Sequence, residues 1–322
     1  MPATHRRQGL NASHLRRLYE ATRSGLRRYP RALAGSLRDG AADASAQHNP
    51  HAQRALERLL AADDGAMWLG HASLLLRIGG LTVLTDPVFS DRIGPRLAGR
   101  TLGIQRLAPM PIDPDRLPRP DVILLSHAHF DHLDTPTLRR LASPDTTIVT
   151  ARATRGLIPD GFRHVVELDW SRELRIRGVR LTALRTEHWG ARAALDRHRG
   201  HNAYLIEAGE RRTLFGGDTA LTDAFDRIGP VDIAALGIGA YESWDHRHAT
   251  PEQAWTMFER MRARRLMPMH HATFDLGEPH AGEPMERLLA AAKDRSTDLV
   301  CPNIGDAWTH HDPRTPPGEA QP

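Results

Sequence analysis

The chain has 322 residues, a formal net charge of +4, and a composition of 40% hydrophobic and 25% charged residues. This composition is that of an ordinary globular protein and excludes collagen, coiled-coil and wholly disordered chains. No run approaches about 18 consecutive apolar residues, and residues 1–30 lack the apolar core of a secretory signal. The single cysteine, Cys301, cannot form an internal disulfide, which permits a reducing compartment. We therefore expect a cytoplasmic protein.

The charge is unevenly distributed along the chain. Residues 1–60 contain 11 arginines and 4 acidic residues, a net charge of +7, so the remainder carries −3. Such a basic arm is suited to peripheral contact with an anionic membrane, and its alternative is a solvated extension. Its aromatic content is too low for a platform that stacks single-stranded bases, which makes nucleic acid the less favoured partner.

The first part of the chain predicts helices separated by a linker. Leucines among arginines over residues 10–29 form a loose amphipathic pattern, and residues 39–50 have the Gly, Ala, Asp and Asn content of a linker. A second helix is expected over residues 51–62, with one apolar face formed by Leu56, Leu59 and Leu60. We assign residues 1–62 to a basic, partly helical extension.

From residue 66 the pattern changes to short apolar runs that predict strands. Gly79 and Gly80 indicate a hairpin turn between two of these runs. Helices are expected over residues 135–142, 251–263 and 284–293. Runs of strands with only some helices between them favour two mixed sheets covered by helices. The expected strands are 67–69, 74–78, 81–85, 122–125, 146–150, 164–168, 174–184, 203–208, 212–216 and 231–236.

Three imidazoles and a carboxylate occur within six residues, directly after the buried strand predicted at 122–125. They are His127, His129, Asp131 and His132. As packing these groups are costly, because each must be desolvated and paired, whereas imidazole and carboxylate are common metal ligands. His127 and His129 could share one ion, and Asp131 and His132 could face a second.

Three further ligand types lie at the ends of later apolar runs. His188, Asp218 and His270 each follow such a run, and strand ends line the functional edge of layered α/β folds. His271 is an alternative ligand to His270. The sequence therefore predicts seven candidate metal ligands gathered from distant parts of the chain.

The seven-residue pattern resembles the metallo-β-lactamase superfamily. The motifs around it are similar to those of the N-acylphosphatidylethanolamine-hydrolysing phospholipase D branch and its bacterial relatives, over about residues 66–310. The motifs are Trp68-Leu69-Gly70-His71-Ala72-Ser73, Leu84-Thr85-Asp86-Pro87-Val88-Phe89-Ser90, Glu187-His188-Trp189, Gly217-Asp218-Thr219 and Pro268-Met269-His270.

The resemblance implies an α/β fold, a four-layer αββα sandwich over residues 63–312, followed by a disordered tail at 313–322. It also implies two divalent metal ions between the sheet edges, with zinc as the default and Mn or Fe as alternatives. By resemblance, one ion is held by His127, His129 and His188, the other by Asp131, His132 and His270, and Asp218 bridges the two.

The implied activity is a dinuclear metal-dependent hydrolase, a phosphodiesterase acting on a small-molecule or phospholipid substrate with a metal-bridging hydroxide as nucleophile. Asp131 would also orient the nucleophile, and His248 would stabilise an oxyanion or donate to a leaving group. Thr250-Pro251 predicts a helix start, which gives His248 a structural alternative. Residues 196–204 and those after His270 depart from the branch, so lactone or amide hydrolysis and nuclease activity remain alternatives, as does a non-catalytic membrane adaptor.

Four other residues have two interpretations each. Asp86 and Asp134 are candidates to hold the second nitrogen of metal-bound imidazoles, although Asp134 could instead cap the helix that follows it. Trp189 forms either a pocket floor or part of the core. His71 follows a predicted strand, and we interpret it as structural.

Overall fold

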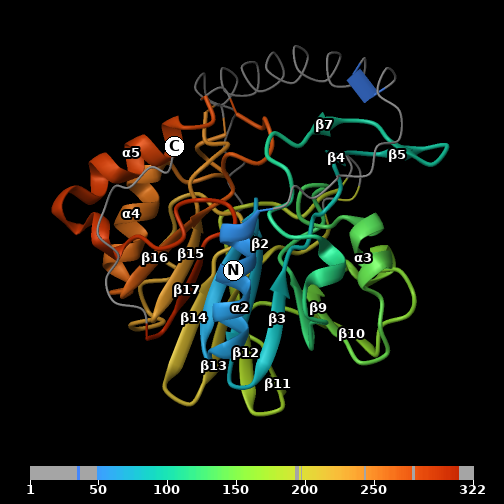
Figure 1. The fold of residues 1–322 in the computed structure, drawn as a ribbon, viewed down its shortest axis with the longest axis horizontal. Helices are drawn as coiled ribbons and strands as arrows, with labels where there is room; N and C mark the ends of the chain where they lie inside the picture. Colours follow the sequence, from blue (N-terminus) through green and yellow to red (C-terminus); the bar gives the residue numbers. More distant parts are fainter. Residues whose placement is uncertain are drawn as a thin grey trace, which may run out of the picture.

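Two β-sheets packed face to face form the centre of the molecule, and helices lie on both outer faces (Figure 1). The structure is a computed structural model that describes residues 35–36, 49–192, 196, 198–242, 244–277 and 280–311. The expected helix at 10–29, most of the linker at 39–50 and the tail at 313–322 lie outside these residues. The predicted αββα sandwich is confirmed.

The first sheet has seven strands in the order β10-β9-β8-β3-β2-β1-β17. Strands β1, β2 and β3 pair antiparallel, and β3, β8, β9 and β10 pair parallel. Gly79 and Gly80 both have positive φ and form the predicted turn between β2 and β3. The strands are β1 (Gly65–Gly70), β2 (Ser73–Ile78), β3 (Leu81–Thr85), β8 (Val122–Leu125), β9 (Thr147–Ala151), β10 (His164–Leu168) and β17 (Ala307–Thr309).

The second sheet has six strands in the order β11-β12-β13-β14-β15-β16. The single strand expected at 174–184 is wrong, because Arg177 and Gly178 both adopt left-handed backbone and turn the chain into an antiparallel pair. The strands are β11 (Glu173–Ile176), β12 (Val179–Arg185), β13 (Asn202–Ala208), β14 (Arg211–Phe215), β15 (Ile233–Gly237) and β16 (Arg265–Met269).

Several short elements were not expected, because most of them have only two or three residues, too few to show a periodic pattern. Two antiparallel pairs lie between β3 and β8, β4 with β7 and β5 with β6. The short elements are β4 (Arg92–Ile93), β5 (Arg96–Leu97), β6 (Arg100–Thr101), β7 (Ile104–Gln105), η1 (Pro114–Arg116), η2 (Arg155–Leu157) and η3 (Lys293–Asp298).

The four α-helices of the described residues begin as the sequence predicts. They are α2 (Pro50–Ala61), α3 (Thr135–Leu141), α4 (Pro251–Arg260) and α5 (Glu283–Ala292), each with proline in its first turn. Side chains of Asn49, Asp134 and Thr250 accept hydrogen bonds from the first turns of α2, α3 and α4.

Helix α2 covers the first sheet, with one difference from the expected apolar face. Leu56 and Leu59 are buried with Ala52 and Ala55, whereas Leu60 is 39% exposed. Leu60 lies about 100° around the helix from Leu59, so it falls at the margin of the buried stripe.

Three apolar layers hold the sandwich together. Trp68, Tyr204 and Phe215 are fully buried between the sheets. A second layer lies under α2 and α3, and a third lies between the second sheet and helices α4 and α5, where Trp255 and Phe258 pack. In the described ranges, no helix has both the length and the hydrophobicity that crossing a bilayer requires.

Candidate metal centre

All seven predicted ligands lie at one edge of the sandwich. Strands β3 and β8 are parallel in the first sheet, and β14, β15 and β16 are parallel in the second. Because the carboxyl ends of parallel strands meet at the same edge, the residues that follow them converge there. His127 to His132 follow β8, His188 follows β12, Asp218 follows β14 and His270 follows β16.

The loop after β8 is fixed by its backbone. The Ser126 amide donates to Asp86 Oδ1 at 2.7 Å, and the amides of His132 and Leu133 both donate to the His129 carbonyl. Ala128 and Leu133 are fully buried in the layer beneath α3. The apolar residues therefore anchor the loop, while the polar ones face the second sheet.

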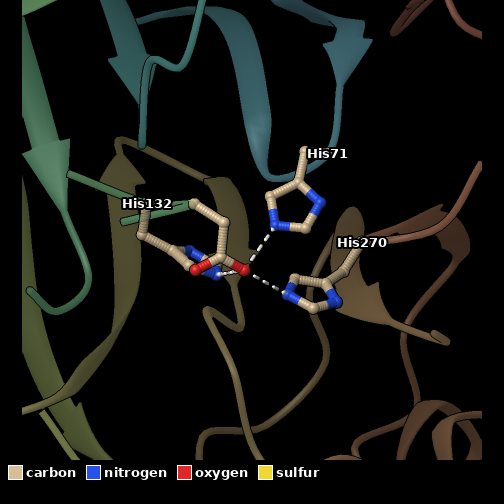
Figure 2. Close-up of side chains that lie close together, drawn as sticks. His71, His132 and His270 are labelled. Atoms are coloured by element: carbon tan, nitrogen blue, oxygen red, sulfur yellow. Dashed lines mark hydrogen bonds and ion pairs between the residues drawn. The ribbon is translucent and has the colours of Figure 1, made fainter. Parts of the chain in front are cut away.

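One group of side chains surrounds the Asp131 carboxylate. Figure 2 shows His71, His132 and His270 around one carboxylate oxygen, Asp131 Oδ2. The Nε2 atoms of these imidazoles lie 3.0, 3.5 and 3.5 Å from that oxygen. One ligand atom from each of the four residues lies within 4.8 Å of the others, so the group could hold a metal ion.

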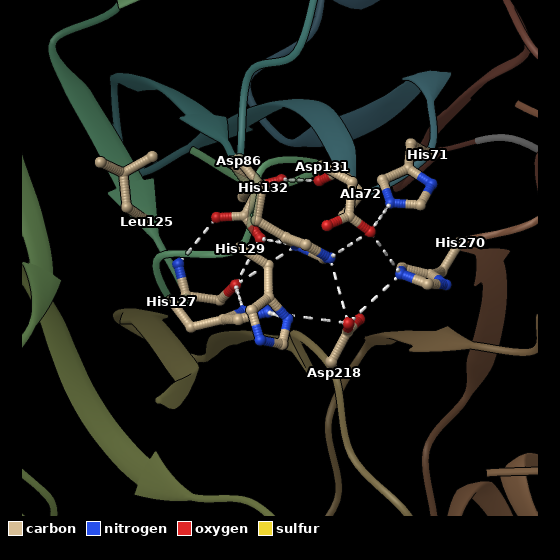
Figure 3. A network of polar contacts seen from close by, with 12 residues as sticks. His71, Ala72, Asp86, Leu125, His127, His129, Asp131, His132, Asp218 and His270 are labelled. Atoms are coloured by element: carbon tan, nitrogen blue, oxygen red, sulfur yellow. Dashed lines mark hydrogen bonds and ion pairs between the residues drawn. The ribbon is translucent and has the colours of Figure 1, made fainter. Parts of the chain in front are cut away.

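A second group lies beside it and consists of His127, His129, His188 and Asp218 (Figure 3 shows three of the four). Their ligand atoms also lie within 4.8 Å of one another. His129 Nδ1 is 2.8 Å from His127 Nε2 and 3.3 Å from His188 Nε2. His127, His129 and His188 lie in this group, and His132 and His270 lie in the other together with His71, which the resemblance does not include.

Asp218 lies between the two groups. Its Oδ2 is 3.8 and 3.6 Å from the Nε2 atoms of His127 and His188, and 3.1 and 3.2 Å from those of His132 and His270. One carboxylate therefore faces imidazoles of both groups, as a bridging ligand must.

Burial and mutual charge determine the protonation of the site. Burial lowers the pKa of His127 and of His188 well below 6.5, and lowers that of His129 to about 4. Burial alone would also lower the pKa of His270, but Asp218 and Asp131 raise it to about 9. Without a metal, the carboxylates are therefore balanced by protons on the imidazoles that face them.

The donor atoms fit divalent cations. Among the described residues, Nε2 of His132, Nε2 of His270 and both carboxylate oxygens of Asp218 are buried and make no hydrogen bond. Buried polar atoms without partners are costly, and imidazole nitrogen with carboxylate oxygen is the usual donor set for zinc and similar ions. Two such ions would satisfy these atoms and replace the protons.

Three of the imidazoles face the site with Nε2 and use their other ring nitrogen, Nδ1, for a hydrogen bond to the protein. His132 Nδ1 donates to Asp86 Oδ2 at 2.7 Å, and His188 Nδ1 donates to the Arg247 carbonyl at 3.0 Å. His127 Nδ1 lies 2.8 Å from the Ser126 hydroxyl, which itself donates to Asp86. These bonds leave each Nε2 lone pair directed into the site.

The two carboxylates with open interpretations differ in role. Asp86 contacts the imidazoles, as described. Asp134 instead caps α3 through the Thr137 amide and accepts from the Ser90 hydroxyl, so the capping alternative is the one observed.

His248 lies in the cluster with Asp218 and His270, its Nδ1 3.9 Å from Asp218 Oδ2. Burial lowers the pKa of His248 to about 3, so the ring is neutral at neutral pH and offers one N–H donor, not a full positive charge.

His271 is buried outside these groups, with its ring against Trp68. His246 stacks on Trp244, away from the ligands.

His71 is the site residue that sequence reasoning missed. It follows β1 as the other candidates follow their strands, but this position alone does not distinguish a residue of the site from a structural histidine. Its side chain is 1% exposed and lies in the group around Asp131.

An aromatic row leads outward from the site. His129, Trp189, Trp244 and His246 have successive ring centroids 4.6, 5.7 and 6.0 Å apart. Trp189, Trp244 and His246 are partly exposed. Trp189 is therefore a wall of the site rather than part of the core.

Two arginines bring positive charge to the same side. Arg192 donates to the carbonyls of Ala128 and Leu133, and its guanidinium lies 4.0 Å from the Phe130 ring centroid. Arg247 donates to the His188 carbonyl and lies over Trp189. Both arginines are only partly buried, and Arg247 brings its charge next to Trp189 of the row.

Comparison with known proteins gives consistent results. A family model described as the β-lactamase superfamily domain matches residues 82–271. The chain is 33% identical over 263 residues to an uncharacterized protein of Mycobacterium tuberculosis, covering 74% of this chain but only 66% of that protein. It is 31% identical over 275 residues to N-acyl-phosphatidylethanolamine-hydrolyzing phospholipase D 1 of Caenorhabditis elegans, covering 77% of this chain and 76% of the relative.

A solved structure shares the fold. Isothiocyanate hydrolase from Delia radicum gut bacteria superposes with a TM-score of 0.61 at 18% identity, covering 76% of this chain and 98% of that structure. The chain therefore belongs to the β-lactamase superfamily. This family membership confirms the superfamily resemblance of the ligand pattern.

Proposed function

We propose that the protein is a phosphodiesterase of the N-acylphosphatidylethanolamine phospholipase D-like type. The observation that carries the proposal is the pair of His/Asp groups that share Asp218 at one buried edge. The similarity to the nematode phospholipase D supports a phospholipid as the substrate class.

We assign one ion to His127, His129 and His188 and the other to Asp131, His132 and His270, with Asp218 shared by both. Zinc is the default for such donors, and Mn and Fe are the alternatives. Two divalent cations held this way lower the pKa of water and counter negative charge that develops on substrate oxygens.

Residues of the chain supply the remaining functions. Asp131 accepts a proton or a hydrogen bond beside the reacting phosphorus and so orients the attacking water. His248 donates its one N–H to a substrate oxygen; its side chain is 13% exposed, against 0–1% for His132, His188 and His270, so a substrate can reach it.

The charge beside the site favours an anionic diester over a neutral lactone. Arg192 donates to the loop that carries the first ligand cluster, at the Ala128 carbonyl, and Arg247 donates to the His188 carbonyl; cationic groups close to a site attract anionic substrates. The aromatic row next to them offers an apolar surface to the rest of an amphiphilic molecule.

The proposal is tested with the metal-reconstituted protein and N-acylphosphatidylethanolamine in mixed micelles, with products measured by mass spectrometry. We expect N-acylethanolamine and phosphatidate in equal amounts. The double variant His127→Ala with His129→Ala should lose one metal equivalent and the activity. His164→Ala with His280→Ala, which changes two exposed histidines, is the matched control.

Two outcomes would contradict the proposal. Hydrolysis of lactone or amide substrates with no cleavage of any phosphodiester would assign a different reaction to the same centre. Full activity in the double variant would show that these imidazoles do not hold a required ion.

The domain boundaries and the location remain predictions. We propose residues 63–312 as the catalytic domain, with α2 packed onto it through Leu56 and Leu59. We also propose a cytoplasmic protein that makes peripheral membrane contact through the basic arm at residues 1–60. In vesicle flotation, replacing Arg16, Arg17, Arg27 and Arg28 with Gln should release the protein from anionic vesicles but not change its behaviour with neutral ones.

A further inference from the structure

His71 lies in the strained turn between β1 and β2. Gly70 has φ +111° and His71 has φ +50°, and the pairing of β1 with β2 is irregular at this point. A left-handed backbone at a non-glycine residue is strained and persists only where the surroundings enforce it. Its presence at a buried imidazole needs an explanation.

The backbone of His71 is held on both sides. Its amide donates to the Thr273 hydroxyl at 2.6 Å, and its carbonyl accepts from the Trp68 indole and from the His270 amide, both at 2.9 Å. The turn is therefore fastened directly to the loop that carries His270, which itself has φ +62°. These contacts fix where the ring of His71 can lie.

The ring contacts one carboxylate oxygen. His71 Nε2 is 3.0 Å from Asp131 Oδ2, and its ring centroid is 4.0 Å from that of His270, the neighbour labelled in Figure 2. Its ring centroid is also 5.2 Å from that of Phe274. An ionised carboxylate only accepts hydrogen bonds, so Nε2 carries the proton and donates it. A nitrogen that carries a proton has no lone pair for a metal.

We propose that His71 is a positioning residue of the metal centre, which orients Asp131 by donating its Nε2–H to Oδ2. The inference rests on the proposed assignment of Asp131 as a ligand. Hydrogen bonds that hold a ligand typically change metal affinity by about 10–100-fold. His71 therefore sets how strongly the ion at Asp131, His132 and His270 is bound, without binding it.

Two amide substitutions test this role. His71→Gln can place an N–H donor near the position of Nε2, whereas the shorter side chain of His71→Asn cannot reach Asp131. Asn also tolerates a left-handed backbone better than most residues, so the variant that loses the contact is the one that best keeps the turn. Thermal unfolding and near-ultraviolet circular dichroism of the metal-free proteins report whether both have folded.

The measurement is titration of the metal-free full-length chain with Zn²⁺ alone, in competition with a chromophoric chelator. We expect two equivalents in the wild-type protein. In His71→Asn one of the two should bind about 10–100-fold more weakly, while His71→Gln stays within about 3-fold of wild type. The visible spectrum with Co²⁺ should change only in His71→Asn.

The outcomes separate this inference from the proposed function. Equal weakening in both variants would make His71 a direct ligand and overturn the positioning role. Two equivalents bound with wild-type affinity in His71→Asn would leave His71 a structural role only. Failure of the wild-type chain to bind two equivalents would overturn the metal assignment itself, and the positioning role with it.

Discussion

The carboxylate of Asp86 bonds to His132 Nδ1 at 2.7 Å and reaches His127 through the hydroxyl of Ser126. These two imidazoles belong to different ligand groups, so one fully buried carboxylate fixes the ring orientation in both. Asp86 itself has φ +32°, and its Oδ1 accepts from the Ser126 amide at 2.7 Å (Figure 3).

Because Asp86 supports imidazoles of both groups, a single substitution of Asp86 should weaken metal binding at both groups. Asp86→Asn can still accept from the Ser126 amide through its oxygen, but the NH2 group that replaces Oδ2 cannot accept from the Ser126 hydroxyl or from His132 Nδ1. We expect affinity for both equivalents of Zn²⁺ to fall by about 10-fold, measured by chelator competition. The substitution Asp115→Asn, at an exposed carboxylate, is the control. Loss confined to one equivalent would mean that Asp86 supports only His132.

The aromatic row predicts a substrate-binding effect away from the reacting bond. Trp244→Ala removes the ring that stacks on Trp189 at 5.7 Å and leaves the ligands intact. Losing a contact that is made equally in the ground and transition states raises KM and leaves kcat unchanged. For one lost aromatic contact we expect KM to rise about 10-fold. Steady-state kinetics should show this for Trp244→Ala but not for Trp244→Phe. A fall in kcat with constant KM would instead place the row at the transition state.

The candidate ligands could be selected from the sequence because of their residue types and positions. Imidazoles and carboxylates at the ends of apolar runs are costly unless they bind something, which selects His188, Asp218 and His270 from a chain with 19 histidines. The layered architecture was predictable because runs of expected strands are separated by helix-start signals such as Thr250-Pro251.

Other features depend on contacts that no local pattern records. His71 meets Asp131 across 60 residues, and the sequence near it resembles any strand end. Asp86 follows the strand β3 and Asp134 precedes the helix α3, and only the fold shows that Asp86 contacts imidazoles while Asp134 caps the helix. The turn at Arg177 interrupts an apolar run that otherwise predicts one strand.

An ion pair between helices predicts a pH-dependent contribution to stability. Arg287 of α5 donates to both carboxylate oxygens of Glu252 of α4 at 2.9 Å, and this hydrogen bonding lowers the pKa of Glu252 below 4.5. A lowered folded-state pKa contributes stability above the unfolded value, and that contribution is lost as the pH falls through the folded value.

Glu252→Gln tests this contribution. The side chains of Arg287 and Glu252 are 35% and 48% exposed, so solvent screens the pair. We therefore expect the free energy of unfolding to fall by only about 0.5 kcal/mol at pH 7. In urea unfolding, the difference from wild type should shrink as the pH falls below 4.5 and vanish once Glu252 is protonated in the folded state. A difference that persists in acid would come from packing rather than charge.

Gly217 lies where the two sheets approach each other closely, at the edge of the sandwich that carries the candidate metal ligands. It has φ +54°, and a Cβ there would lie 2.8 Å from the Asn202 carbonyl oxygen and 3.0 Å from Ser126 Cβ. Gly209, with φ +57°, would meet nothing within 4 Å. Gly209→Ala therefore measures backbone strain alone, about 1 kcal/mol, while Gly217→Ala adds a clash costing about 1–3 kcal/mol more. Urea unfolding of the metal-free proteins should show this order. Equal losses would mean that the loop carrying Ser126 yields freely, and the ligand edge would then not be a rigid frame.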